Sequence, residues 1–286
     1  MATVPSAARH RLVRGVQVPA FFYGTAWKED RTEELTRLAL QAGFTAIDTA
    51  NQRKHYYEAA VGAAVAAFLA EGGRREALFL QTKFTYARGQ DHRLPYDPSD
   101  PYPKQVERSF ASSLEHLRVE HIDSYVLHGP EGGYGLTEGD AAVWKAMESL
   151  QQAGKAKLIG VSNVSLAQLQ TLVRLASVKP AFVQNRCFAR DRWDAEVRAL
   201  CREHDIVYQG FSLLTANARE LASPVVDRIA NRLGRTRAQV VFRFAIQAGM
   251  IPLTGTSNAA HMREDLAAFE FTLEDEEVRA IEHIVR

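Results

Sequence analysis

Apolar residues recur along the chain in two patterns that predict two kinds of element. Short runs of consecutive apolar, β-branched or aromatic residues predict buried strands, and longer segments with apolar residues at helical spacing predict amphipathic helices. Two short runs on either side of Arg14-Gly15 predict a β-hairpin, Leu12–Val13 with Val16–Val18. Core strands are then expected at Phe21–Gly24, Thr45–Asp48, Leu78–Thr82, Ile122–Leu127, Leu158–Val161, Phe182–Gln184, Val207–Phe211 and Ile251–Leu253.

Helical segments separate these strands. The segment Thr32–Ala42 has apolar residues at helical spacing and stops at Gly43, which suits a left-handed helix cap. The last helix follows the cap-like residues Thr272 and Asp275. The other helices, ending with this last one, are expected at Ala59–Ala70, Lys104–Leu117, Ala141–Ala153, Leu166–Leu175, Trp193–His204, Pro224–Ala230, Arg237–Gln247, His261–Ala268 and Leu273–Val285.

The order of these elements predicts the fold. Strands and helices that alternate strictly, with continuous apolar strands, are typical of a closed parallel barrel. We therefore expect an α/β fold, a single (β/α)8 TIM barrel over residues 1–286 with an N-terminal β-hairpin and a C-terminal helix. An open doubly wound sheet is the alternative, but no strand is followed by its Gly-x-Gly-x-x-Gly nucleotide motif.

Composition narrows the class of protein. The chain has 286 residues, of which 46% are hydrophobic and 24% charged, and its formal net charge is +1. These values are ordinary for a globular protein and give no reason to expect nucleic acid or a membrane as partner. Cys187 and Cys201 lack the spacing of metal ligands, and we find no signal peptide. We expect a cytoplasmic monomer or weak homodimer without a metal.

Polar residues follow the apolar strands at the rim where the active site of such a barrel lies. Asp48 ends the second strand, Lys83 follows the third and His128 follows the fourth. The fifth, sixth and seventh strands lead into Ser162, Asn163, Gln184, Asn185, Phe211 and Ser212. Any one of these residues alone could be a helix cap, a solvated charge or a core side chain. An acid, a lysine and a histidine together on three successive strands indicate a catalytic site.

The ordered series of motifs resembles the aldo-keto reductase family over nearly the whole chain. The resemblance implies a nicotinamide-dependent carbonyl reductase on a barrel, with a catalytic tetrad of Asp, Tyr, Lys and His. Asp48, Lys83 and His128 match three of these positions. The matching segments are Phe21–Thr25, Ala46–Ala50, Thr82-Lys83, Leu127-His128, Gly160–Asn163, Val183–Asn185, Ile251-Pro252 and Arg263–Leu266.

These residue types suit hydride transfer to a carbonyl. The carbonyl oxygen gains negative charge as hydride arrives, so a proton donor must lie within hydrogen-bond reach. Tyrosine is a weak acid, but an adjacent lysine ammonium favours the tyrosinate and is expected to lower the pKa of the hydroxyl. Asp48 would hold Lys83 charged, and His128 would give the carbonyl a second hydrogen bond.

The tyrosine of the tetrad is ambiguous in this sequence. Many family members have it five residues after the aspartate, where this chain has Arg53. Counting back from the helix start at Glu58–Gly62 gives His55, whereas Tyr56 is the first tyrosine after the aspartate. We predict Tyr56 as the acid, with Tyr57 and then His55 as alternatives, because a neighbouring lysine disfavours a protonated imidazole.

The same resemblance implies NADPH as cofactor, with NADH possible. Ser162, Asn163 and Gln184 would hydrogen-bond the carboxamide, and Phe211 would stack on the nicotinamide. The sequence lacks the Lys-Ser pair that often accompanies an arginine clamp on the 2′-phosphate, so we expect a modest preference for NADPH. The other residues expected to contact the cofactor are Ser212, Leu214, Thr254, Gly255, Thr256, Ser257, His261, Arg263 and Asp265.

Aromatic residues in loops at the same rim suggest the substrate. The loop Tyr86–Pro103 is either a surface excursion or part of an aromatic wall for a hydrophobic or aromatic aldehyde or ketone. We expect lower activity on open-chain sugars than on aromatic carbonyls. The chain lacks the long C-terminal tail that closes the site in some members, so an open mouth is expected. The predicted substrate contacts are Tyr23, Trp27, Tyr57, Tyr86, Tyr96 and Tyr134.

Two other functions compete with carbonyl reduction. A nicotinamide-binding barrel with little turnover would serve as a redox sensor or scaffold, although such a protein needs no proton-transfer residues. An isomerase or aldolase would use Lys83 as a Schiff-base amine, and borohydride would then trap its substrate.

Overall fold

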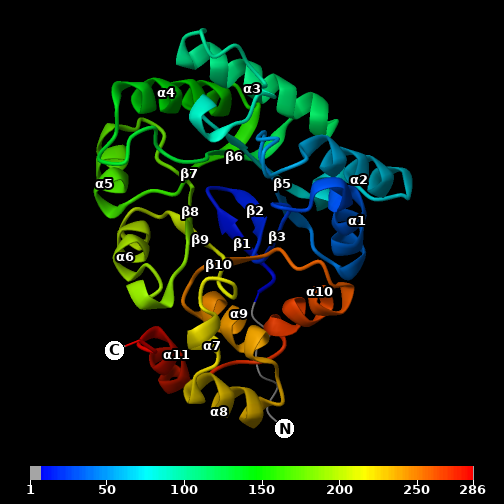
Figure 1. Cartoon of the computed structure of the whole chain (residues 1–286), viewed down its shortest axis with the longest axis vertical. Coiled ribbons are helices and arrows are strands. Elements are labelled where there is room, and N and C mark those ends of the chain that lie inside the picture. The colour runs from blue at the N-terminus through cyan, green and yellow to red at the C-terminus, as the bar shows by residue number, and fades with distance from the viewer. Residues whose placement is uncertain (1–7, 286) are drawn as a thin grey trace.

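Parallel strands close into a barrel at the centre of the computed structural model, which describes residues 8–285. The strands are β3 (Phe22–Gly24), β4 (Ala46–Asp48), β5 (Phe79–Phe84), β6 (Ile122–Leu127), β7 (Ala156–Ser162), β8 (Phe182–Arg186), β9 (Val207–Phe211) and β10 (Ile251–Thr254). Strand β10 closes the ring by pairing with β3 (Figure 1). The predicted (β/α)8 barrel is confirmed. Its limits, 1–286, stay a prediction, because residues 1–7 and 286 lie outside the described residues.

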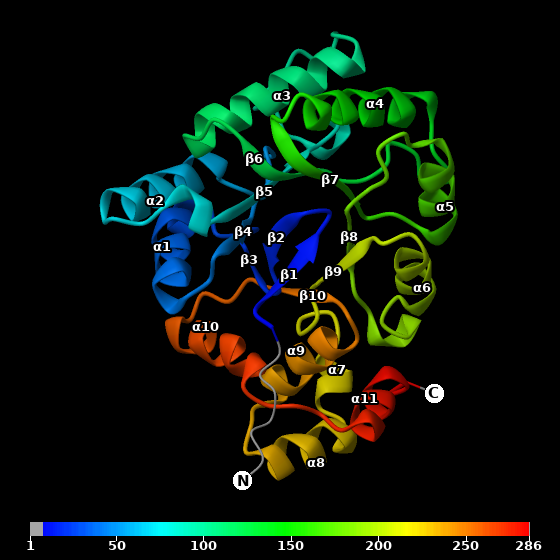
Figure 2. The same ribbon diagram turned by 180° about the vertical axis from the view of Figure 1, so that it is seen from behind.

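Helices cover the outside of the barrel, as Figures 1 and 2 show from its two sides. In the described part of the chain they are α1 (Thr32–Ala42), α2 (Glu58–Ala70), α3 (Tyr102–Leu117), α4 (Glu138–Gln152), α5 (Leu166–Leu175), α6 (Ala195–Glu203), α7 (Ala218–Leu221), α8 (Pro224–Leu233), α9 (Arg237–Gln247), α10 (Ala259–Leu266) and α11 (Asp275–Glu282). The predicted bounds of α1, α5 and α9 are confirmed at both ends.

Local capping explains where other helix ends differ from the prediction. Helix α4 begins earlier than predicted because Thr137 and Asp140 cap each other's backbone N–H groups. Helix α6 begins later because Trp193 and Asp194 have left-handed φ angles of 55° and 60°. Glu274, rather than the predicted threonine, caps α11. The ends of α2, α3, α8 and α10 differ from prediction by up to three residues.

Several strands extend further toward the C-terminal rim than the sequence predicts. Strand β5 continues to Phe84 and β7 to Ser162, so Lys83 and Ser162 lie inside their strands rather than after them. The predictions stop at Thr82 and Val161, one residue before Lys83 and Ser162. The backbone pairing continues because these polar side chains find hydrogen-bond partners inside the barrel.

The predicted N-terminal hairpin is confirmed as β1 (His10–Val13) and β2 (Val16–Pro19), paired antiparallel. Figure 1 shows it across the middle of the ring of strands. Val13 and Val18 pack with Phe22, Phe79 and Phe182 in one buried cluster at the beginning of the barrel strands. The hairpin therefore covers the N-terminal end of the barrel with apolar side chains and leaves polar chemistry to the other end.

Helices α2 and α3 approach closely at Gly62, which generates a test of the packing. A Cβ atom added there would lie 1.9 Å from the carbonyl oxygen of His116 and 2.9 Å from Cα of Leu117. We expect Gly62→Ala to lower the free energy of unfolding by about 1–3 kcal/mol, because backbone must move. Gly133→Ala is the control, since its Cβ would meet nothing within 4 Å. Urea denaturation that finds Gly62→Ala as stable as wild type contradicts this packing.

Candidate active site

A buried ion pair lies inside the barrel near its C-terminal rim. Lys83 Nζ is 2.7 Å from both carboxylate oxygens of Asp48 and donates a third hydrogen bond, of 2.8 Å, to the carbonyl of Thr49. Lys83 is 0% exposed and Asp48 is 3% exposed. Burial lowers the pKa of Lys83, and the Asp48 carboxylate opposes that shift. All three ammonium protons therefore have an acceptor, which keeps the amine charged and fixed in place.

Three glutamine amides surround this pair, and we call Gln81, Gln184 and Gln209 the glutamine layer. Gln81 and Gln184 donate to Asp48 Oδ1 over 2.7 and 3.0 Å. Both also donate to Gln209 Oε1, over 2.8 and 3.0 Å. Ser124 supports Gln81 through a 2.8 Å hydrogen bond. Only Gln184 was predicted as a site residue, although a glutamine inside an otherwise apolar strand was a usable signal for the other two.

The structure brings the four predicted catalytic residues together. The Tyr56 ring meets the edge of the His128 ring with centroids 5.8 Å apart, and Lys83 Nζ is 5.2 Å from the Tyr56 centroid. Burial raises the pKa of the Tyr56 hydroxyl, and the Asp48 carboxylate raises it further. This direction is opposite to the lowering predicted from Lys83, because burial and the Asp48 carboxylate both disfavour the tyrosinate.

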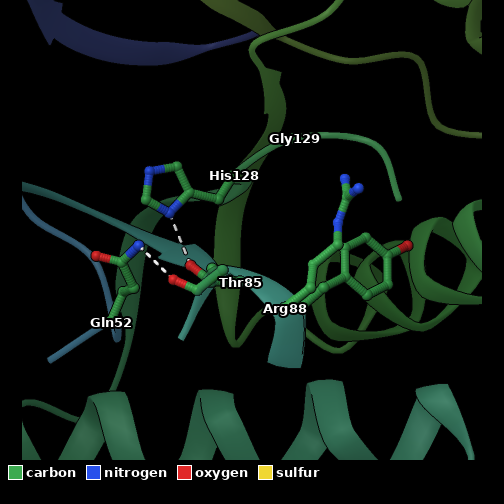
Figure 3. Close-up of a pocket in the computed structure, with 7 residues that line it drawn as sticks. Gln52, Thr85, Arg88, His128 and Gly129 are labelled. Carbon is green, nitrogen blue, oxygen red and sulfur yellow. Dashed lines mark hydrogen bonds between the residues drawn. The ribbon is translucent and has the colours of Figure 1, made fainter. Parts of the chain in front are cut away.

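His128 is held as a neutral ring beside the candidate acid. Burial, the Lys83 charge and the nearby His55 lower its pKa to about 3. Its Nδ1 lies 2.7 Å from the Thr85 hydroxyl, as Figure 3 shows. When that hydroxyl donates, the single proton of the neutral ring is on Nε2, which can donate to a carbonyl oxygen.

The two alternative acids face other partners. The Arg53 guanidinium lies over the Tyr57 ring, with Cζ 3.9 Å from the ring centroid. The His55 ring stacks on Trp27 with centroids 3.9 Å apart, and its carbonyl accepts the Trp27 N–H. Tyr56 is thus the member of this trio that contacts both Lys83 and the neutral histidine.

A cavity of about 180 Å³ opens beside His128 (Figure 3), lined by Gln52, Thr85, Tyr86, Arg88, Gly89, His128 and Gly129. Of the residues predicted to form an aromatic wall, Tyr86 lines it. Tyr23 is 0% exposed and donates to the carbonyl of Thr256, and Tyr96 is buried with its hydroxyl on the carbonyl of Thr85. The hydroxyl of Tyr86 donates to the buried carboxylate of Asp140. Tyr134 and Trp27 are exposed rather than packed around the cavity.

The residues predicted to hold the nicotinamide lie at the same rim. Ser162 donates to the carbonyl of Gln184 over 2.6 Å, and Asn163 donates to the carbonyl of His128 over 2.8 Å. The ring of Phe211 is partly exposed, and Ser212 and Leu214 are partly buried beyond it. A second cavity, of about 310 Å³, adjoins this region between the loops after β7 and β8.

The segment predicted to bind the cofactor phosphate forms many of its hydrogen bonds internally. Asn258 caps α10 by accepting the N–H groups of Ala260 and His261. Thr254 donates to Asp265 over 2.8 Å, and burial raises the pKa of that carboxyl to about 6. Both side chains are buried, whereas Gly255, Ser257, His261 and Arg263 are exposed and Thr256 is partly buried.

One residue that the prediction missed reaches this segment. Lys28 follows Gly24–Trp27, and its ammonium donates a hydrogen bond to the carbonyl of Gly255. Its position three residues after the matching Phe21–Thr25 segment was the signal that could have identified it. Lys28 adds a positive charge where the predicted cofactor residues lack a lysine.

Other site classes have no counterpart in residues 8–285. No group of three or more His, Cys, Asp or Glu side chains there is arranged to hold a metal ion. None of the helices described is long and apolar enough to cross a membrane.

Comparisons with known proteins confirm the resemblance found in the sequence. The Aldo/keto reductase family model matches residues 21–286. Aldo-keto reductase family 1 member C1 of Homo sapiens is 30% identical over 282 residues, which cover 88% of this chain and 82% of that protein. An aldo-keto reductase of Mycobacterium avium (strain 104) is 32% identical over 267 residues, covering 93% and 86%.

Solved structures agree. The crystal structure of an aldo/keto reductase from Brucella melitensis matches with a TM-score of 0.82 and 26% identity, over 96% of this chain and 97% of that one. A second, the apo form of Gox0644, matches with a TM-score of 0.80 and 26% identity, over 96% and 93%. The chain therefore belongs to the aldo/keto reductase family of NAD(P)H-dependent oxidoreductases, which act on carbonyl groups.

Proposed function

We propose that this protein reduces the carbonyl group of an aldehyde or ketone with NADPH, and that Tyr56 is the general acid. The observation that carries the proposal is the contact of Tyr56 with both Lys83 and His128 beside the 180 Å³ cavity. A cytoplasmic location and a monomeric or weakly dimeric state stay predictions.

The chain offers groups that fit a nicotinamide. Asn163 and Gln184 use their amide N–H groups in hydrogen bonds to the protein. Within the described residues no donor reaches Asn163 Oδ1 or Gln184 Oε1, so both oxygens are free to accept the carboxamide N–H groups. The partly exposed face of Phe211 is free to stack on the ring.

Each residue of the tetrad then has a distinct task. When bound, the cofactor supplies the hydride that adds to the carbonyl carbon. Tyr56 donates its proton to the carbonyl oxygen, and His128 donates the Nε2 proton in a hydrogen bond that orients the same oxygen. Lys83, 5.2 Å from the Tyr56 centroid, stabilises the tyrosinate by its charge, and Asp48 holds that charge in place.

The geometry gives no support to Schiff-base chemistry at Lys83. A Schiff base requires a neutral amine whose lone pair can reach a carbonyl carbon. Lys83 Nζ is buried and surrounded by three acceptor oxygens from Asp48 and Thr49. A carbonyl compound would have to displace the carboxylate to reach it.

Replacement of the candidate acid is the direct test of this function. We expect Tyr56→Phe to lower kcat for aldehyde reduction by about 100-fold or more, because the positioned proton is lost while packing is kept. Cofactor binding, measured by fluorescence quenching, should be nearly unchanged. Tyr57→Phe is the matched control, since that ring lies against Arg53. If Tyr56→Phe turns over normally and Tyr57→Phe or His55→Phe does not, another residue supplies the proton.

The low pKa of His128 predicts a pH dependence. With a pKa near 3 the ring is neutral at working pH, so kcat/KM should show no inflection near pH 6.5. As the pH falls below about 6.5, the unfolded chain takes up a proton at His128 that the folded protein does not, so stability is lost. Between about pH 7.5 and pH 5, His128→Gln should lose about 1–2 kcal/mol less stability than wild type in urea denaturation. Identical losses would contradict a buried neutral ring.

The segment after β10 predicts the cofactor preference. Asn258 already accepts the N–H groups of Ala260 and His261, and Arg263 is exposed. We expect NADPH to bind more tightly than NADH, but only modestly. The Lys-Ser pair is absent and Lys28 is hydrogen-bonded to the carbonyl of Gly255, which forgoes about 1–3 kcal/mol of phosphate recognition. Arg263→Gln should weaken NADPH binding and leave NADH binding unchanged. Dissociation constants from fluorescence quenching measure both, and tighter binding of NADH by wild type would refute the preference.

A further inference from the structure

A guanidinium group lines the candidate active-site cavity without a carboxylate partner. Arg88 lies in the 3-10 turn Ala87–Gly89 after β5 and lines the same cavity as His128 (Figure 3). Its Nη2 donates to the carbonyl of Pro130, which fixes the group at the cavity wall. Within the described residues, its Nε and Nη1 donate to no protein atom. N–H groups on both of these nitrogens are therefore available to a ligand.

The acidic groups on the facing loop and helix have other partners. Glu131 accepts hydrogen bonds from the hydroxyls of Tyr102 and Thr137. Asp140 accepts the backbone N–H groups of Glu131 and Thr137. Because both carboxylates are satisfied by uncharged donors, neither forms an ion pair with Arg88 in the structure.

More positive charge lies on the same side of the cavity. The loops after β4 and β5 are joined by hydrogen bonds from glutamine side chains of each loop to the backbone of the other. They carry Arg53 and Lys54, which have no ion-pair partner among the described residues, whereas Arg93 is paired with Asp91. Arg53, Lys54 and Arg88 thus lie on this side of the cavity without ion-pair partners among the described residues, and their charges attract anions.

We propose that Arg88 binds a carboxylate of the substrate, so that the enzyme reduces aldehydes or ketones that carry a carboxylate remote from the reacting carbonyl. This rests on the proposed reductase function. The carbonyl oxygen lies at Tyr56 and His128, and the carboxylate accepts from N–H groups of Arg88 that the protein leaves unused. The cavity of about 180 Å³ exceeds the ~150 Å³ that admits benzene, so one ring fits between the two ends. Arg88 thereby narrows the expected substrate from any hydrophobic or aromatic carbonyl to one that carries a carboxylate.

A matched pair of aldehydes tests the carboxylate directly. 4-Formylbenzoate and its methyl ester share the ring and the aldehyde but differ in charge. For wild type, kcat/KM should be higher for the acid, and added salt should reduce that advantage. Arg88→Gln should lower kcat/KM for the acid by about tenfold, mainly through KM, and change the ester by less than about twofold. Arg88→Lys should fall between, and Arg202→Gln, an exposed change on α6, should alter neither.

The possible outcomes distinguish failure of the carboxylate subsite from failure of the reductase function. Equal losses for acid and ester in Arg88→Gln, or unchanged turnover of the acid, would overturn the carboxylate subsite while the reductase function stands. Reduction of the ester in preference to the acid by wild type would do the same. If wild type oxidises neither NADPH nor NADH with either aldehyde, the reductase function and the subsite both fail.

Discussion

The buried carboxylate of Asp48 is the constraint on which the interior of this barrel depends. A carboxylate and an ammonium removed from water lose hydration that costs several kcal/mol per ion, and only close contact with further hydrogen bonds offsets that cost. Asp48 receives these bonds from Lys83 and from Gln81 and Gln184 of the glutamine layer. Strands β4, β5, β8 and β9 must therefore keep their register for the charge to be tolerated. Removing one partner of such a pair typically costs about 3–5 kcal/mol, so stability and proton chemistry share one contact.

Gln184 connects this constraint to the cofactor region. Its amide nitrogen is committed to Asp48 and Gln209, which leaves its oxygen directed by the same network. A group that donates a hydrogen bond to that oxygen therefore acts on a side chain already bonded to the Asp48 carboxylate. Under the proposed function, this arrangement links cofactor recognition to the orientation of Lys83 through Asp48, on strands of the same barrel.

The sequence was most informative where one physical signal dominated. Continuous apolar strands and helical spacing predicted the barrel, and strand ends predicted Asp48, Lys83 and His128. The contents of the interior were harder to predict, because Gln209 interrupts an apolar run without revealing which strand it faces. Whether each tyrosine is exposed also depended on tertiary structure. Tyr23 follows the pattern of a binding residue at the end of a strand, but its side chain is buried in the core. Nothing in the sequence indicated that Arg88 lines the cavity, because this depends on how the loop after β5 folds.

The hairpin β1–β2 has a consequence for how protons travel. Val18 of the hairpin packs with Phe22, Phe79 and Phe182 in an apolar layer at the N-terminal end of the barrel. This apolar layer contains no chain of polar groups along which a proton could move. Under the proposed function, exchange between the buried tetrad and bulk water runs through the mouth that the substrate occupies. Tyr56 would then be reprotonated from solvent only after the product has begun to leave.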